Sequence, residues 1–306
     1  MANLTVVTGF FLMGFSNIWE LHAIIFLLIY LVALMSNILI FTLISLDRKL
    51  HTSMYFFLKN LSFLDLCLLS TTVPKSITNS LSGSCYISFW GCVSQLFLMV
   101  LFVASELFLL TVMSYDRYVA ICQPLHYELI MTREACVKMA AASWLTGGLF
   151  GAQFSTSVFT LPFCGSKEIH QFFCDVPPLL RISCSETHLA VDVSVAFGIG
   201  VGVFCSIYIT IAYSHIFSIV LKIPTREGRS KAFSTCLPHL IVLMVFITTV
   251  FIAYLQPPQE SDSLLDLLLP MFYTVLPPNM NPIIYSLRNK DIKTALVKLI
   301  SRHHIE

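Results

Sequence analysis

Charged residues are scarce in this sequence. Of its 306 residues, 11% are Asp, Glu, Lys or Arg and 57% are hydrophobic, and the mean hydropathy is +0.81. A water-soluble domain carries about 25% charged residues, so this chain has too few to cover a surface exposed to water. The formal net charge is only +1, so no basic field argues for a nucleic-acid partner. The shortage of charge indicates a protein of the lipid bilayer.

The patterns typical of enzymes and of several transporters are missing as well. No Ser-His-Asp set, Gly-rich phosphate loop or paired-His helix is found, and "GIGVG" (198–202) has no strand–turn–helix context for a dinucleotide. No basic segment with a small-residue cleavage site opens the chain, so we expect no cleavable signal peptide. The chain has no internal repeat, unlike the inverted-repeat transporters. We therefore expect no enzymatic activity, no cofactor and no metal.

Long apolar runs are what the sequence does contain, at about 22–46, 56–78, 91–115, 138–161, 193–220, 234–256 and 265–286. Each is near the ~20 residues that a helix needs to cross ~30 Å of hydrocarbon. All are too long and too continuous for the short alternating strands of a membrane barrel. Gly147 and Gly151 suit a close helix contact, either within the bundle or at a dimer face. The predicted fold is all-α, a membrane protein with a seven-transmembrane helix bundle that forms one domain over 1–306.

Positive charge predicts the orientation of this bundle. If the N-terminus is outside, 15 of the 18 Lys and Arg residues fall inside, as the positive-inside rule expects. The extracellular tail is then 1–21, with Asn3 as a glycosylation acceptor, the helices and loops occupy 22–286, and 287–306 is cytoplasmic. In this last segment apolar residues recur at helical spacing among lysines, which predicts a short interfacial helix. We expect a multi-pass protein of the plasma membrane.

Two acidic residues lie within the apolar segments. Asp65 and Glu106 each cost about 2.5–3.5 kcal/mol to insert, so both need polar partners, and Asn37 and Asn281 are expected nearby. Two interpretations stay open: a shared cation or proton site, or hydrogen bonds that hold the helices together. His239 lacks the three or four ligands of a zinc site, which favours a hydrogen-bonded switch or a packing element.

Four motifs carry a resemblance to one receptor family. They are "HTSMYFFLKNLSFLDLC" (51–67), "MSYDRYVAICQPLHY" (113–127), "KAFSTCLPHL" (231–240) and "NPIIYSLRNKDIK" (281–293). In this order, over nearly the whole chain, they resemble the odorant (olfactory) receptors among the rhodopsin-like (class A) G-protein-coupled receptors.

The resemblance implies a switch at the cytoplasmic side. Arg117 would be held by Asp116 at rest and would swing toward the G protein and Tyr213 on activation, while Tyr285 moves and Pro282 permits the bend. The implied switch residues are Asp116, Arg117, Tyr118, Tyr213, His239, Asn281, Pro282 and Tyr285, and the implied buried polar or ion site is Asn37, Asp65 and Glu106. It also implies disulfides between Cys92 and Cys174 and between Cys164 and Cys184.

Four positions depart from the family pattern. Ser36 stands where the family usually has Gly, and Ser53 where it usually has Pro. Ile247 replaces a usual Tyr, which predicts a less polar floor for the ligand site. Pro238 stands where Ser is usual and is expected to perturb its helix locally.

The ligand site of such receptors lies between the outer halves of the third, fifth, sixth and seventh helices. By position, the predicted lining is Met99, Val100, Val103, Ala104, Phe197, Val201, Ile247, Phe251, Tyr254, Met271 and Thr274. The alternative for each is ordinary packing between helices. Met99 stands where amine receptors carry an Asp, and 265–286 has no Lys for a retinal Schiff base. We therefore expect a small, uncharged or weakly polar volatile ligand.

The predicted function is an odorant-activated receptor that couples to a stimulatory, olfactory-type G protein and raises cyclic AMP. Its expected location is the cilia of olfactory sensory neurons. The alternative from another class is a proton- or ion-linked transporter that uses Asp65, Glu106 and His239. Substrate flux in proteoliposomes without a G protein would favour this alternative.

Overall fold

Long helices dominate the computed structural model, which describes residues 8–12, 19–82, 85–164, 167–169, 171–185, 187–255, 274–285 and 290–303. The helices are α1 (Trp19–Leu46), α2 (Ser53–Ser82), α3 (Phe89–Cys122), α4 (Tyr127–Ile130), α5 (Arg133–Phe159), α6 (Val176–Arg181), α7 (Leu189–Val220), α8 (Arg226–Leu255), a helix over 274–285, and α10 (Lys290–His303). Two 3-10 turns, η1 (Arg48–Leu50) and η2 (Pro124–His126), follow α1 and α3. Each of the seven predicted segments contains a helix.

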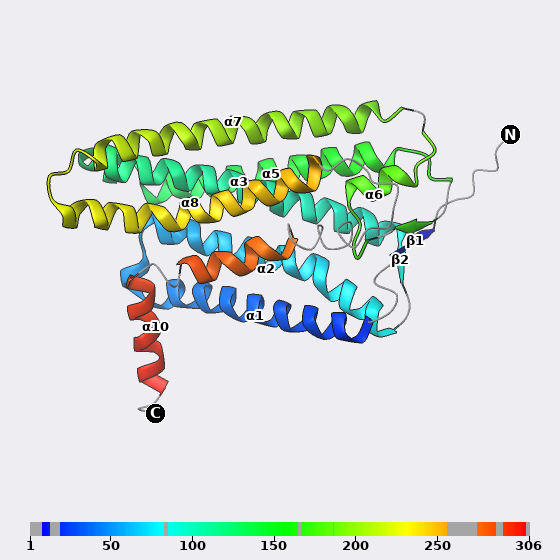
Figure 1. Cartoon of the computed structure of the whole chain (residues 1–306), viewed down its shortest axis with the longest axis horizontal. Coiled ribbons are helices and arrows are strands. Elements are labelled where there is room, and N and C mark those ends of the chain that lie inside the picture. Colours follow the sequence, from blue (N-terminus) through cyan, green and yellow to red (C-terminus); the bar gives the residue numbers. More distant parts are fainter. Residues whose placement is uncertain are drawn as a thin grey trace.

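The long helices lie side by side in one bundle (Figure 1). Within the described residues, four helical stretches are long and apolar enough to cross a membrane: Leu27–Leu46, Ser53–Asn79, Phe89–Cys122 and Leu189–Val220. The prediction of an all-α membrane bundle is confirmed, and the helix after the bundle is present as α10.

Helix α3 is longer than the apolar segment that predicts it. It was predicted over 91–115 but begins at Phe89, because the Ser88 hydroxyl accepts the Gly91 N–H at 3.1 Å and caps the first turn. It continues to Cys122 and ends just before Pro124, which cannot extend a helix. The ends of α3 are therefore set by Ser88 and Pro124, which lie outside the hydrophobic run.

A small sheet covers one end of the bundle and was not predicted. Strand β1 (Gly9–Leu12) lies between β2 (Tyr86–Ser88), to which it is antiparallel, and β3 (Glu168–Ile169), to which it is parallel. Phe10 of β1 is fully buried, and its ring meets that of Phe163 edge-on at 5.5 Å. The chain before α1 is thus packed into the loops at this end, called the sheet end below (Figure 1).

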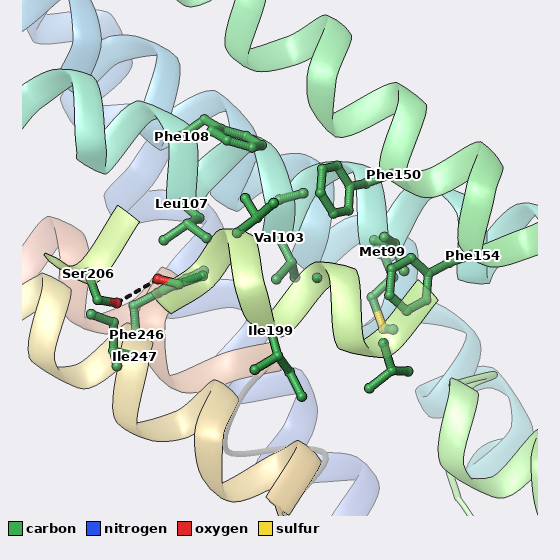
Figure 2. A pocket seen from close by; sticks show the side chains of 16 residues that line it. Met99, Val103, Leu107, Phe108, Phe150, Phe154, Ile199, Ser206, Phe246 and Ile247 are labelled. Atoms are coloured by element: carbon green, nitrogen blue, oxygen red, sulfur yellow. Dashed lines mark hydrogen bonds between the residues drawn. The ribbon is translucent and has the colours of Figure 1, made fainter. Parts of the chain in front are cut away.

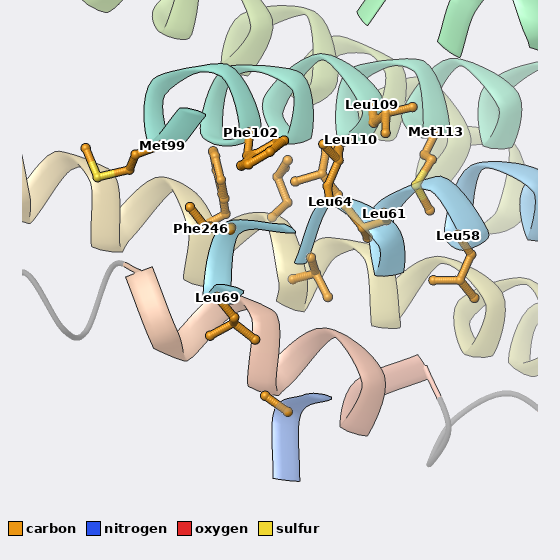
Figure 3. Packing of buried hydrophobic residues seen from close by; sticks show 14 of the residues in the cluster. Leu58, Leu61, Leu64, Leu69, Met99, Phe102, Leu109, Leu110, Met113 and Phe246 are labelled. Atoms are coloured by element: carbon orange, nitrogen blue, oxygen red, sulfur yellow. The ribbon is translucent and has the colours of Figure 1, made fainter. Parts of the chain in front are cut away.

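Part of the core lies where α2, α3 and α8 meet (Figure 3). Its buried apolar side chains include Leu58, Leu61, Leu64, Leu69, Met99, Phe102, Leu109, Leu110, Met113 and Phe246. Leu58, Leu61 and Leu64 of α2 recur every three residues, as one face of a helix requires. Between membrane helices, such side chains stabilise the bundle through close van der Waals packing.

Glycines bring α5 close to α3. A Cβ at Gly147 would lie 2.6 Å from the Leu101 carbonyl oxygen, and one at Gly151 would lie 2.7 Å from the Phe97 carbonyl oxygen. Backbone atoms cannot give way at these distances, so only glycine allows the contact. The prediction of a close contact is confirmed, and the contact lies within the bundle.

Helix α10 leaves the opposite end of the bundle at a steep angle (Figure 1). Ile292 is buried, whereas Val297 is 62% exposed. The Tyr55 hydroxyl donates to Asp291 Oδ2 at 2.9 Å, which anchors α10 to α2. Near the same place the Lys49 N–H lowers the pKa of the Asp47 carboxyl. This end is called the α10 end below.

Candidate functional site

A cavity of about 170 Å³ lies between α3, α5, α7 and α8. Its described lining is Met99, Val100, Val103, Ala104, Leu107, Phe108, Phe150, Phe154, Val195, Gly198, Ile199, Val201, Gly202, Ser206, Phe246 and Ile247. Figure 2 shows side chains from these helices turned toward one space. Such an apolar, concave space suits a small organic ligand.

The structure brings part of the predicted ligand set together. Met99, Val100, Val103, Ala104, Val201 and Ile247 line this cavity. Phe197 does not; it is 52% exposed and stacks on Phe150 with ring centroids 5.5 Å apart. Thr274 is buried but is not part of the lining. The side chains of Phe251, Tyr254 and Met271 lie outside the described residues.

Sequence reasoning missed the walls that α5 and α7 provide. Phe150 and Phe154 close the cavity from α5, and Gly198 and Gly202 leave space on the α7 side. The sequence held one signal for this, because the two glycines are four residues apart and therefore lie on one face of a helix. No signal in the sequence indicated that α5 turns aromatic rings toward this face.

Below the cavity, two buried acids share one amide. Asn281 Nδ2 donates to both carboxylate oxygens of Asp65, at 3.2 and 3.0 Å, and to Glu106 Oε1 at 3.1 Å. Asp65 and Glu106 are at most 1% exposed. Asn37 does not join them; its amide donates to the carbonyls of Ala33 and Pro278 at 3.0 and 2.9 Å.

This cluster bears on both interpretations of the acids. It joins α2, α3 and the 274–285 helix by hydrogen bonds, as interhelical glue requires. Two carboxylates so close together also favour a shared proton or cation, because both are unfavourable as free anions in a buried place. No group of three or more His, Cys, Asp or Glu side chains that could hold a metal occurs in the described part of the chain.

At the α10 end, Arg117 pairs with Asp116 next to it. Arg117 Nε donates to Asp116 Oδ2 at 3.0 Å, and its Nη2 contacts the same oxygen. Asp116 is 1% exposed, so this pair is shielded from water. Arg117 is therefore held on its own helix, α3, and does not bridge to α7.

Tyr127 holds the other oxygen of Asp116. Its hydroxyl donates to Asp116 Oδ1 at 2.9 Å and lies 3.1 Å from Ser53 Oγ. The same hydroxyl oxygen therefore contacts both Asp116 and Ser53. Burial raises the pKa of Tyr127 and keeps this donor protonated. Ser53, which replaces the Pro usual in the resembling family, thereby supplies a hydrogen bond that Pro cannot make.

The remaining predicted switch residues lie in three places. Tyr213 of α7 hydrogen-bonds through its hydroxyl to Nδ1 of His239 on α8. Tyr118 packs its ring edge-on against His215, with centroids 6.2 Å apart. Tyr285 and Pro282 are buried in the 274–285 helix, and the Tyr285 hydroxyl has no hydrogen-bond partner among the described residues.

Two disulfides lie at the sheet end. Cys92 of α3 is bonded to Cys174, and Cys164 is bonded to Cys184, with Cα atoms 5.5 and 5.8 Å apart. These are the two pairs that the resemblance implies. Cys85 is a free, half-buried thiol in this region. The bonds fix the loop between α5 and α7 over the end of α3. Asn3 lies outside the described residues.

Comparison with known proteins covers nearly the whole chain. A family model described as olfactory receptor matches residues 26–303. Human olfactory receptor 14A2 is 58% identical over 99% of this chain and 97% of its own length. Human olfactory receptor 14A16 is 58% identical over 98% of each, and olfactory receptor 1G1 of Gorilla gorilla gorilla is 46% identical over 97% of this chain and 96% of its own. The chain therefore belongs to the olfactory receptor family, a family of odorant-sensing, multi-pass G-protein-coupled receptors that are not enzymes.

Proposed function

We propose that a small, largely apolar volatile molecule binds in the cavity between α3, α5, α7 and α8. Binding shifts a two-state equilibrium toward a form whose α10 end is open. A stimulatory, olfactory-type G protein then binds there and raises cyclic AMP. In this proposal the sheet end is extracellular, Asn3 is glycosylated, and the receptor works in the ciliary plasma membrane of olfactory sensory neurons.

The observation that carries the proposal is that cavity and switch share three helices. On α3, Val103 of the cavity precedes Asp116 by thirteen residues, or about 20 Å along a helix. On α7, Ser206 precedes Tyr213 by seven residues, and on α8 His239 precedes Phe246 by seven. The Tyr213–His239 bond is thus two helical turns, about 10 Å, from the cavity on both helices.

This arrangement suggests how a ligand acts at a distance. A molecule that pushes α8 away from α7 at Phe246 and Ser206 strains the bond between Tyr213 and His239, because both helices move as stiff rods. Loss of that bond frees the Tyr213 hydroxyl to meet Arg117, once Arg117 has left Asp116.

The buried acids connect to the same switch. Asn281, which binds both Asp65 and Glu106, lies four residues before Tyr285 on one helix. A proton or a cation held between the acids would therefore act on the helix that carries Tyr285.

A cyclic AMP reporter in cells supplied with the olfactory G protein, screened against an odorant panel, tests the proposal. Arg117→Ala should reduce the odorant response at least tenfold while surface expression stays near normal. Arg133→Ala, at an exposed position on the same end, is the matched control and should respond as the native receptor. A full response in Arg117→Ala would contradict the switch assignment, and failure of every odorant to raise cyclic AMP would contradict the coupling.

A further inference from the structure

Ser206 is the one polar side chain in the described lining of the cavity. The other lining residues are aliphatic, aromatic, Met or Gly. The Ser206 hydroxyl donates its hydrogen to the Gly202 carbonyl, one helical turn earlier, at 2.8 Å (Figure 2). Because a hydroxyl has one hydrogen and two lone pairs, the oxygen that remains for a ligand is an acceptor.

This geometry distinguishes between ligand groups. The O–H of an alcohol or phenol can donate to Ser206 and add a hydrogen bond, while the Ser206–Gly202 bond stays intact. A ketone or aldehyde offers only an acceptor, so the Ser206 hydrogen has to leave the Gly202 carbonyl, and one bond replaces another. Only the first ligand gains a bond.

The space beside Ser206 limits the size of the apolar part. A Cβ at Gly202 would meet no atom within 4 Å, and one at Gly198 would meet the Phe154 ring at 3.4 Å. The cavity of about 170 Å³ is similar in volume to an engineered cavity of about 150 Å³ that binds benzene. A single ring or a short chain fits this space.

We infer that the cavity selects a compact apolar alcohol or phenol, which donates its hydroxyl hydrogen to Ser206, over the carbonyl compound with the same skeleton. The inference rests on one part of the proposed function, namely that the ligand binds in this cavity. One additional net hydrogen bond corresponds to an affinity ratio of about two- to tenfold.

Binding to the purified full-length receptor in nanodiscs tests this inference without a G protein. The probes are matched pairs, cyclohexanol with cyclohexanone and benzyl alcohol with benzaldehyde, and the dissociation constant is taken from the concentration dependence of thermal stabilisation. We expect the alcohols to bind about two- to tenfold more tightly. In Ser206→Ala the two members of each pair should bind equally, mainly through weaker binding of the alcohol.

Ser214→Ala is the matched control. Like Ser206, Ser214 donates to the carbonyl four residues earlier, in this case that of Thr210 at 2.7 Å. Unlike Ser206, Ser214 lies on an exposed face of α7. This variant should keep the alcohol preference. Equal binding of both members by the native receptor, a preference that survives in Ser206→Ala, or no stabilisation by either alcohol would overturn the inference. If Ser206→Ala does not fold, the ratio in the native receptor decides.

The cyclic AMP reporter, run with the same probe pairs and variants, separates this inference from the proposed function. An alcohol preference that depends on Ser206, without a cyclic AMP response, supports the inference and contradicts the coupling. A cyclic AMP response to both members of each pair that does not depend on Ser206 supports the coupling and contradicts the inference.

Discussion

The Tyr127 hydroxyl donates to Oδ1 of Asp116 at 2.9 Å, while Arg117 occupies Oδ2. Both oxygens of a buried carboxylate are therefore satisfied, one by a residue of α4 and one by a residue of α3 itself. Bonds to a charged group contribute about 1.5–3 kcal/mol each, so this pair of contacts stabilises the form in which Arg117 is held.

Neutralising Asp116 should therefore raise signalling without ligand. Asp116→Asn keeps the shape of the side chain but loses its attraction to Arg117, and we expect basal cyclic AMP to rise severalfold. Tyr127→Phe removes only one of the two contacts and should give a smaller rise. Glu134→Gln changes an exposed acid that pairs with Lys138 at 2.6 Å and should have no effect. Unchanged basal cyclic AMP in Asp116→Asn, at normal surface expression, would show that Asp116 does not hold the receptor in its inactive form.

A methyl group added to α7 should reduce the size of ligand that the receptor accepts. In Gly202→Ala the new Cβ enters the cavity, so the EC50 of the bulkiest active odorants should rise about tenfold and that of the smallest should change little. Gly200→Ala adds the same group on an exposed face where no atom lies within 4 Å, and it should leave all EC50 values unchanged. Cyclic AMP dose–response curves for odorants of graded size measure this. Equal effects of the two substitutions would place the ligand elsewhere.

Adjacent glycines of α5 should differ sharply in their tolerance of alanine. In Gly147→Ala the Cβ meets the Leu101 carbonyl oxygen at 2.6 Å, and overpacking of this kind costs about 1–3 kcal/mol. At Gly148 the nearest atom is 4.0 Å away, so Gly148→Ala should be neutral or slightly stabilising because alanine favours helix. Thermal unfolding of the two purified variants compares them. A Gly147→Ala receptor as stable as the native one would contradict the close packing of α5 on α3.

The bond between Cys92 and Cys174 should be needed for a stable receptor, whereas Cys85 should not. Loss of a native disulfide typically costs about 2–5 kcal/mol, so Cys174→Ser should lower both the melting temperature and the amount of receptor at the cell surface. Cys85→Ser removes a free thiol of the same region and should retain both. Antibody staining of intact cells gives the surface level. The reverse order of the two variants would show that Cys85 takes part in the native pairing.

Some parts of the site could be read from the sequence because they depend on near neighbours along the chain. Asp116 and Arg117 are adjacent, so their pairing needs no tertiary contact. Met99 and Val103 lie on one face of α3. The motif at 113–127, later in the same helix, identifies the receptor family, and the family's ligand site then predicts that this face is turned toward the ligand. Phe197 shows the limit, because its exposure depends on how α7 is rotated about its own axis.

Hydropathy by itself determined the number and approximate place of the membrane helices, since each apolar run must be long enough to cross the bilayer. Only the tertiary structure decided which residues form the cavity, because Phe154, Gly202 and Phe246 lie on three helices that share no local pattern. It also decided that β1 pairs with loops far along the chain, and that Tyr127 reaches Asp116. These contacts depend on how helices rotate and pack against one another, which a one-dimensional pattern of apolar and polar residues does not specify.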